Sequence, residues 1–182
     1  LRIPNLIIET ILLITMKQLA TLIATALSFS VLAQSPITSV PIELFGDHIF
    51  IKVSIDGSEP LDFIFDTGSG LTVLDKDVAD RLGLSGKKVK LNETKTTFEL
   101  IKHNTIEINN FLMEKNLKVY SSDLDHLEIS LGRDFDGIVG YDLMHHHTLH
   151  INYEDQVIDI YDHGKGPKKG DAIPFDLEIS IP

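Results

Sequence analysis

Apolar and polar residues alternate with a period of two along most of the chain from residue 41 onward, as in strands that bury one face. Residues 49–55, the turn at residues 56–58 and residues 61–66 predict a β-hairpin whose second strand ends at Asp66. Residues 149–161 predict another hairpin, which turns at residues 154–156. We therefore expect a mainly β fold.

The pattern also predicts one or two short helices. Asp75 is suited to cap a helix whose apolar positions fall on one face, and Gly83 follows at its end. Residues 121–131 have room for a turn or two of helix, whereas residues 105–119 contain two more strand-like runs. We expect these helices to be short additions to a mainly β domain.

The amino-terminal region has the composition of a targeting segment. Met16 and Lys17 begin a short positive stretch, and an apolar run follows and ends in small residues before Gln34. We interpret residues 16–33 as a signal peptide cleaved after Ala33 and predict export to the periplasm or the extracellular space. The alternative is a retained membrane helix, but this run falls short of the ~20 apolar residues that a span needs. No stable membrane anchor is expected.

The domain organisation is inferred from the length of the chain and from its turn-forming and linker-like segments. Residues 1–15 precede the natural-looking start and are interpreted as an upstream or non-native segment. Residues 38–163 are expected to form one lobe, and residues 164–182 a linker with the possible start of a second lobe. Residues 173–177 have the same order of residue types as residues 40–44, and this similarity either marks the start of that lobe or arises by chance.

Composition excludes several kinds of chemistry. The chain has no cysteine, so neither a disulfide, a thiol nucleophile nor a thiolate metal site can form. Its formal net charge of -11 repels nucleic acid, and its lysines are scattered or grouped in short loop-like clusters. We expect no nucleic-acid partner.

One carboxylate stands at the end of an apolar strand, at a turn that contains two glycines. This turn is Asp66-Thr67-Gly68-Ser69-Gly70, and a second segment, residues 136–140, has the glycines and apolar residues of a buried strand. Peptide hydrolysis by carboxylates requires two of them near one water, where like charge prevents both from ionising. A glycine at position 68 permits the close approach of backbone and carboxylate that such a site needs.

With Phe-Ile-Phe before Asp66 and Ser-Gly after Gly68, the chain resembles the aspartic proteases, especially the retropepsin-like bacterial families. The resemblance implies a closed β-barrel lobe in which Asp66 is one half of a catalytic dyad. It implies that Thr67, Gly68 and Ser69 support the catalytic loop and that Ile138-Val139-Gly140 packs behind it. The Ser69 hydroxyl is expected to donate to the ionised Asp66, which favours an acidic working pH.

The resemblance implies an aspartic-type endopeptidase that needs no cofactor and acts on a peptide or protein substrate. Because the chain holds one Asp-Thr-Gly, the second aspartate must come from a second lobe or from a homodimer partner. A mobile flap is expected within residues 90–103. The alternative function is an exported binding or scaffold module that retains a single acid-protease lobe without turnover.

Two other chemistries were weighed and set aside. If residues 145–150 form a strand, His145 and His147 share one face and His146 and His150 the other, so at most two imidazoles converge. A catalytic zinc needs three protein ligands, and no metal site is expected. Ser69 lacks the spacing of a hydrolase nucleophile elbow, and no lysine follows the glycines as in a phosphate-binding loop.

Overall fold

The computed structural model describes residues 16–18, 35–90, 97–167 and 170. The chain divides into two compact units, Leu1–Gln34 and Ser35–Pro182. Residues 16–18 of the first unit are helical. Over the described ranges, every helix falls short of the length and apolar character required to cross a bilayer.

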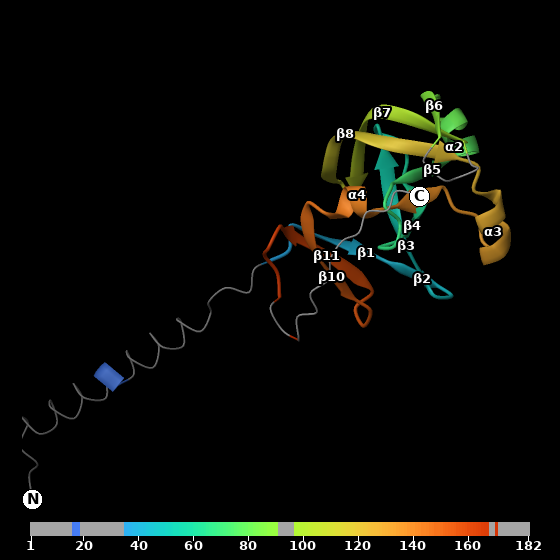
Figure 1. Ribbon diagram of the computed structural model, residues 1–182. Coiled ribbons are helices and arrows are strands. Elements are labelled where there is room, and N and C mark those ends of the chain that lie inside the picture. Colours follow the sequence, from blue (N-terminus) through green and yellow to red (C-terminus); the bar gives the residue numbers. More distant parts are fainter. Residues whose placement is uncertain (1–15, 19–34, 91–96, 168–169, 171–182) are drawn as a thin grey trace, which may run out of the picture. The chain divides into compact units, whose positions relative to one another are not determined.

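The second unit contains two sheets in the part that the structure describes. The smaller has the order β1-β11-β10, and the larger has the order β2-β3-β4-β9-β5-β8-β7-β6. Their strands are β1 (Thr38–Pro41), β2 (Glu43–Phe45), β3 (His48–Ile55), β4 (Leu61–Phe65), β5 (Val73–Asp75), β6 (Lys87–Lys90), β7 (Thr97–Ile108), β8 (Phe111–Ser122), β9 (Gly137–Val139), β10 (His147–Asn152) and β11 (Val157–Asp162). The small sheet and the β6–β7 hairpin lie at opposite ends of the unit (Figure 1).

The larger sheet closes on itself. Strand β3 pairs with β4 on one side and also with β7, where Val53 lies opposite Ile108, so that β3, β4, β9, β5, β8 and β7 form a ring. Strand β9 is parallel to β4 and antiparallel to β5, while β5 is parallel to β8. The closed mainly β barrel predicted from the sequence is confirmed.

The two predicted hairpins are present with nearly the predicted bounds. At the β3–β4 turn, Asp56 and Gly57 have φ angles of 51° and 80°, the left-handed backbone of tight hairpin turns. The register places Phe50 opposite Ile64, so β4 ends immediately before Asp66. Strands β10 and β11 pair from His147 to Asn152.

Both predicted helices are present, and a third short helix was missed. Helix α2 (Lys76–Arg81) begins as predicted at Asp75, whose carboxylate accepts hydrogen bonds from the amides of Asp77 and Val78. Helix α3 (Asp125–Leu131) lies within the second predicted segment. The unpredicted helix α4 (Tyr141–Met144) follows β9 directly.

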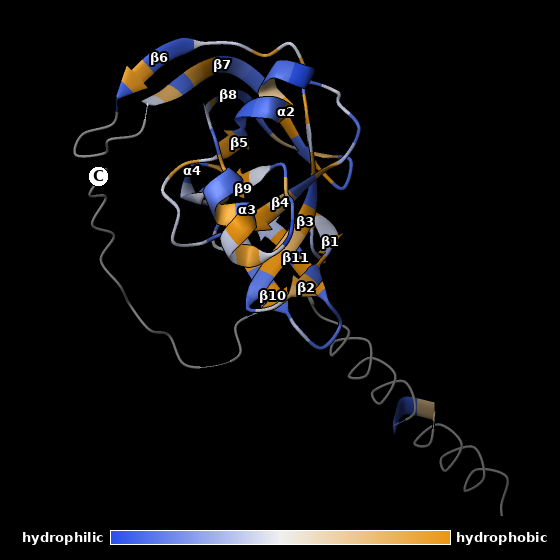
Figure 2. Ribbon diagram, turned by 90° about the vertical axis from the view of Figure 1, so that its right-hand side faces the viewer, coloured by the Kyte–Doolittle hydropathy of each residue, from blue (hydrophilic) through white to orange (hydrophobic). Residues whose placement is uncertain are grey.

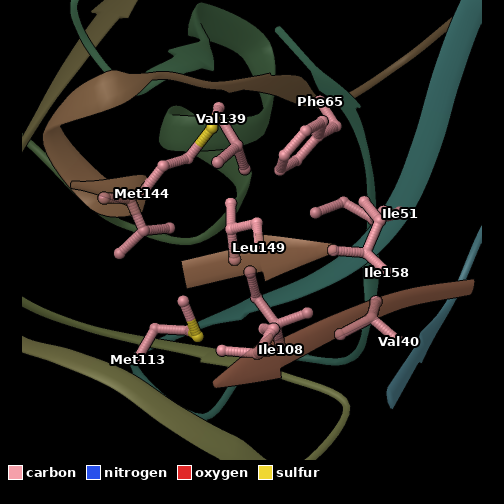
Figure 3. Close-up of a pocket in the computed structure, with 11 residues that line it drawn as sticks. Val40, Ile51, Phe65, Ile108, Met113, Val139, Met144, Leu149 and Ile158 are labelled. Atoms are coloured by element: carbon pink, nitrogen blue, oxygen red, sulfur yellow. The ribbon is translucent and has the colours of Figure 1, made fainter. Parts of the chain in front are cut away.

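The main hydrophobic core fills the barrel and the space between it and the small sheet. Strands β3 and β4 carry many hydrophobic residues, whereas most of the turns are polar (Figure 2). Side chains from both sheets, including Phe65, Val139, Leu149 and Ile158, converge with the thioethers of two methionines (Figure 3). The cavity that they leave is about 10 Å³, roughly one water probe, so this region is packing core without room for a ligand.

The predicted segments 1–15, 16–33 and 164–182 lie wholly or largely outside the described residues, and so do parts of two further predictions. The centre of the predicted flap, residues 91–96, is one of them, although β6 and β7 pair on either side of it from Lys87 opposite Leu100 to Lys90 opposite Thr97. The segment 173–177, which echoes residues 40–44, is the other. The described lobe from β1 to β11 spans nearly the same residues as the predicted lobe, 38–163.

Candidate active site

Asp66 is the first residue after β4, and its position is set by backbone hydrogen bonds. Its amide donates to the carbonyl of Val139 at 3.1 Å, and its own carbonyl accepts from the amide of Ser69 at 3.3 Å. Its carboxylate Oδ1 accepts from the amide of Gly68 at 2.8 Å. The turn therefore holds the half-buried carboxylate from within and ties its start to β9.

Gly68 lies so close to the Asp66 carboxylate that a side chain at this position would crowd it. A Cβ at this position would lie 3.2 Å from Oδ1 of Asp66, closer than most Cβ contacts. Because Gly68 has no Cβ, its amide approaches the carboxylate without crowding it. The Thr67 side chain is exposed beside Asp66.

The Ser69 hydroxyl differs from the expectation. It donates to the carbonyl of Leu71 at 2.8 Å, whereas the sequence analysis placed this donation on Asp66. The local geometry explains the difference, since the turn brings the Leu71 carbonyl to the hydroxyl, while the Gly68 amide already reaches the carboxylate. The Ser69 side chain thus stabilises the turn by its hydrogen bond to the Leu71 backbone and not by one to the Asp66 carboxylate.

Residues 138–140 lie directly behind this turn. Ile138 pairs with Ile64 of β4 on one side and with Val73 of β5 on the other, so β9 separates the two strands that flank the turn. Gly140 packs against the backbone of Leu71, where an added Cβ would lie 2.3 Å from the carbonyl oxygen. A side chain at this position would push the turn away from β9.

A buried polar pair at the end of the turn was not predicted from the sequence. Thr72 is completely buried, and Asp142 of α4 accepts from both its amide, at 2.9 Å, and its hydroxyl, at 2.8 Å. The one signal in the sequence is a threonine flanked by Leu71 and Val73, a polar residue in an apolar run. Its partner is 70 positions away, which no local pattern indicates.

Burial raises the pKa of the Asp142 carboxyl above its usual value. Hydrogen bonds from the Thr72 amide and hydroxyl and from the Leu143 amide, and the nearby His145, oppose this rise in pKa. Desolvation is the largest of these effects, so Asp142 is a carboxylate held in an environment that disfavours its charge.

Asp66 lines an open groove of about 340 Å³. One wall comes from the β2–β3 turn, with Asp47 and His48, and another from the end of the small sheet, with Ile151 and Tyr153. Tyr153 is 60% exposed although it is aromatic. The groove is thus polar around the acid and has an apolar margin, and its walls were not predicted from the sequence.

The histidines are arranged differently from the predicted strand. His145 ends helix α4, and only His147 and His150 belong to β10, because the unpredicted helix continues through residues 141–144. The rings of His145 and His146 lie 3.7 Å apart, and His146 Nε2 is 3.8 Å from a carboxylate oxygen of Glu114. Over the described ranges, no three His, Cys, Asp or Glu side chains are placed to hold a metal ion.

A barrel that holds an Asp-Thr-Gly turn against a buried apolar-apolar-glycine strand is the arrangement expected of an acid-protease lobe. A family model described as aspartyl protease matches residues 51–143, more than half of the 182 residues. This match contains Asp66, β9 and Asp142. The chain belongs to the aspartyl protease family.

Solved structures similar to the unit include three proteases or protease-like domains. A retropepsin-like aspartic protease from Rickettsia conorii is 22% identical, covers 68% of this chain and 90% of its own, and has a TM-score of 0.48. The retroviral protease-like domain of Ddi1 from Leishmania major is 12% identical over 64% and 96% of the two chains, with a TM-score of 0.43. The protease of EIAV, complexed with the inhibitor HBY-793, is 20% identical over 51% and 96%, with a TM-score of 0.32. No curated protein matches the chain.

Proposed function

We propose that this chain supplies one half of an aspartic endopeptidase, with Asp66 as its catalytic carboxylate. The observation that carries the proposal is the position of Asp66, which follows a buried strand, is held by the Gly68 amide and lines an open groove. Family membership supports the same role. Thr67, Gly68 and Ser69 support the loop, and Ile138, Val139 and Gly140 back it.

The second aspartate comes from another copy of the chain or from a second lobe. The sequence contains one Asp-Thr-Gly, and hydrolysis by this mechanism needs two carboxylates that share a proton across one water. One of them then acts as the base that activates the water, while the protonated one donates to the substrate carbonyl. Since the pair must hold one proton, we propose fastest cleavage in mildly acidic medium.

The substrate is an extended peptide, and the site of action is outside the cytoplasm. The groove at Asp66 is open, and its walls offer both polar groups and the exposed ring of Tyr153. The composition of residues 16–33 is the support for export. No metal or cofactor enters the proposed reaction.

The proposal is tested by comparing peptide cleavage by the wild-type chain and by Asp66→Asn over a range of protein concentrations and at pH 4 to 7. Loss of the carboxylate is expected to reduce kcat/KM by at least about a thousandfold, as removal of a catalytic group typically does. Asp62→Asn is the matched control, because Asp62 lies on the same strand and its carboxylate pairs with Lys52 outside the groove at Asp66.

A statine-type inhibitor, which mimics the transition state, separates the two candidate functions. The protease is supported if wild type cleaves peptide, the inhibitor blocks this cleavage, and Asp66→Asn does not cleave. Equal cleavage by wild type and Asp66→Asn contradicts the role of Asp66. A wild-type chain that associates and binds peptide, yet cleaves none, supports the binding module instead.

A further inference from the structure

We propose that Asp142 is a positioning residue, which fixes the turn that carries Asp66 by holding the buried Thr72. This inference rests on the proposed function of Asp66. Asp142 lines a groove of about 400 Å³ beside β8 and α4, which shares no lining residue with the groove at Asp66. Its carboxylate therefore acts on the site through Thr72 and does not meet a substrate bound at Asp66.

The contacts of Thr72 show how firmly this end of the turn is held. Besides the two hydrogen bonds to Asp142, the Thr72 hydroxyl accepts from the amide of Gly140 at 3.3 Å, and its carbonyl accepts from the amide of Tyr120 at 3.0 Å. Every polar group of this fully buried residue thus has a partner. Contacts from β8, from α4 and from Gly140, which joins β9 to α4, meet at this one residue.

The other contacts of the turn go to the same short segment. The amide of Tyr141 donates to the carbonyl of Ser69 at 2.8 Å, and the amide of Asp66 donates to Val139. The start, middle and end of the turn are therefore fixed to successive residues from 139 to 142. Within this set, Asp142 provides the only contact made by a charged side chain, and charge-assisted hydrogen bonds are the stronger kind.

Asp142→Asn keeps one acceptor oxygen and replaces the other with a donor, so one of the two buried donors of Thr72 loses its partner. An unsatisfied buried donor costs on the order of 1–3 kcal/mol, so the end of the turn is expected to open until water reaches it. Asp66 lies six residues earlier on the same turn, and a catalytic carboxylate tolerates only about 0.5 Å of displacement. The expected consequence is a mobile acid in a lobe that is otherwise folded.

The first test measures amide hydrogen exchange over residues 66–72 in the full chain. Exchange there is expected to be at least about tenfold faster in Asp142→Asn and in Thr72→Val than in wild type, the factor that corresponds to one lost buried hydrogen bond. Exchange in β3 and β11 should be unchanged. Thr72→Ser keeps the hydroxyl and should restore wild-type exchange.

Two further variants make the test specific. Glu114→Gln is the matched control, because Glu114 lines the same groove as Asp142 but bonds to the adjacent Lys115 amide and not to the turn. It should exchange like wild type. The double variant Asp142→Asn/Thr72→Val should exchange no faster than the faster single variant, since Thr72→Val already removes the hydroxyl that Asp142 holds.

Cleavage by an active wild type adds a kinetic test. A positioning residue is expected to lower kcat by about tenfold or more in Asp142→Asn and Thr72→Val while KM stays within about twofold. Unchanged exchange in both variants, or faster exchange with an unchanged kcat, overturns the positioning role. If Asp142→Asn does not fold, the Thr72→Val and Thr72→Ser pair decides the question alone.

The two proposals fail in different ways. Exchange reports on the turn whether or not the chain cleaves peptide, so faster exchange in the variants supports the role of Asp142 as the holder of the turn. A wild type that cleaves no peptide at any concentration overturns the proposed function only.

Discussion

At the scale of single residues, the candidate site depends on buried polar groups that satisfy one another. Asp66 presents its carboxylate to a groove, and Asp142 uses its carboxylate to hold Thr72. Both are aspartates close to a turn, but burial separates their roles. Burial raises the pKa of the Asp142 carboxyl, whose two oxygens hold Thr72.

The raised pKa of Asp142 predicts a pH dependence of stability. A folded-state pKa above the usual 3.8 means that the folded protein binds this proton more tightly than the unfolded chain does. Asp142 therefore adds stability that is fully present below the unfolded pKa and is lost as pH rises through the folded pKa. Above that window its contribution is constant.

Urea unfolding of wild type and Asp142→Asn at a series of pH values measures this effect. The free energy of unfolding of wild type minus that of the variant should decrease as pH rises from about 3.8 through the folded pKa, because the variant cannot titrate at this position. A difference that stays constant across this range would show that the Asp142 environment does not disfavour its charge.

Local sequence patterns predicted the residues of the Asp66 turn but not what holds them. The turn is readable because Asp-Thr-Gly follows an apolar strand, so acid, glycine and strand are neighbours in sequence. The Thr72–Asp142 pair is not readable in this way, since it joins residues 70 positions apart. The Ser69 hydroxyl was misplaced because its acceptor, the Leu71 carbonyl, is brought to it by the conformation of the turn, which the order of residues does not reveal.

At the scale of elements, β9 is the strand on which the site depends. It inserts between β4 and β5, and Gly137 within it and Gly140 just after it allow neighbours to approach more closely than any side chain permits. Gly137 faces the Phe63 ring, and Gly140 faces the Leu71 backbone. The carbonyl of Leu71 belongs to a turn that is itself held, so it cannot easily move aside.

Replacement of Gly140 by alanine is therefore expected to destabilise the lobe. The added Cβ would lie 2.3 Å from the Leu71 carbonyl oxygen and 2.4 Å from its carbon. Relief of such overlap costs about 1–3 kcal/mol, measured as a fall in the free energy of unfolding. The backbone φ of Gly140 is -104°, so the cost arises from space and not from dihedral strain.

Gly70→Ala is the matched control for this experiment. Gly70 belongs to the same turn, but an added Cβ there meets nothing within 4 Å. Its free energy of unfolding should stay within about 0.5 kcal/mol of wild type, as for most unconstrained surface changes. Equal effects of the two alanines would mean that the turn adapts and that β9 does not set its position.

Hairpins and capped helices were predictable because their signals are local. The β3–β4 and β10–β11 hairpins and helix α2 follow from alternation, turn residues and the capping Asp75. The parallel pairing of β4 with β9 brings together strands from distant parts of the chain, and no periodicity reveals a partner. Helix α4 is only four residues long, and missing it placed His145 and His146 in a strand.

At the scale of the whole molecule, the proposed function requires a second carboxylate to reach the groove at Asp66. Its margin includes Ile151 and the exposed Tyr153. Ile151 belongs to β10, which is an outer strand of the small sheet over the described residues. An aromatic ring exposed at the margin of a groove fits an association surface. We expect activity to depend on protein concentration, because association completes the dyad.

A charge at the groove margin should weaken this association. Tyr153→Asp is expected to raise the protein concentration for half-maximal peptide cleavage by about tenfold or more. Sedimentation should show that the variant dimer dissociates at correspondingly higher protein concentrations than the wild-type dimer. Ile129→Asp on α3 is the control, because Ile129 is 82% exposed but lies outside the groove. A wild type that stays monomeric and cleaves peptide equally well at every concentration contradicts the homodimer.

The distance in sequence between the turn and its supports has a consequence for biosynthesis. The ribosome makes Asp66 and Thr72 well before β9 and α4, which supply the carbonyl of Val139 and the carboxylate of Asp142. Pairings of such long sequence separation form slowly, because the intervening loop must first close. Under the proposed function, a nascent chain thus carries Asp66 on an unsupported turn, so that cleavage of neighbouring polypeptides cannot begin until β9 and α4 have left the exit tunnel.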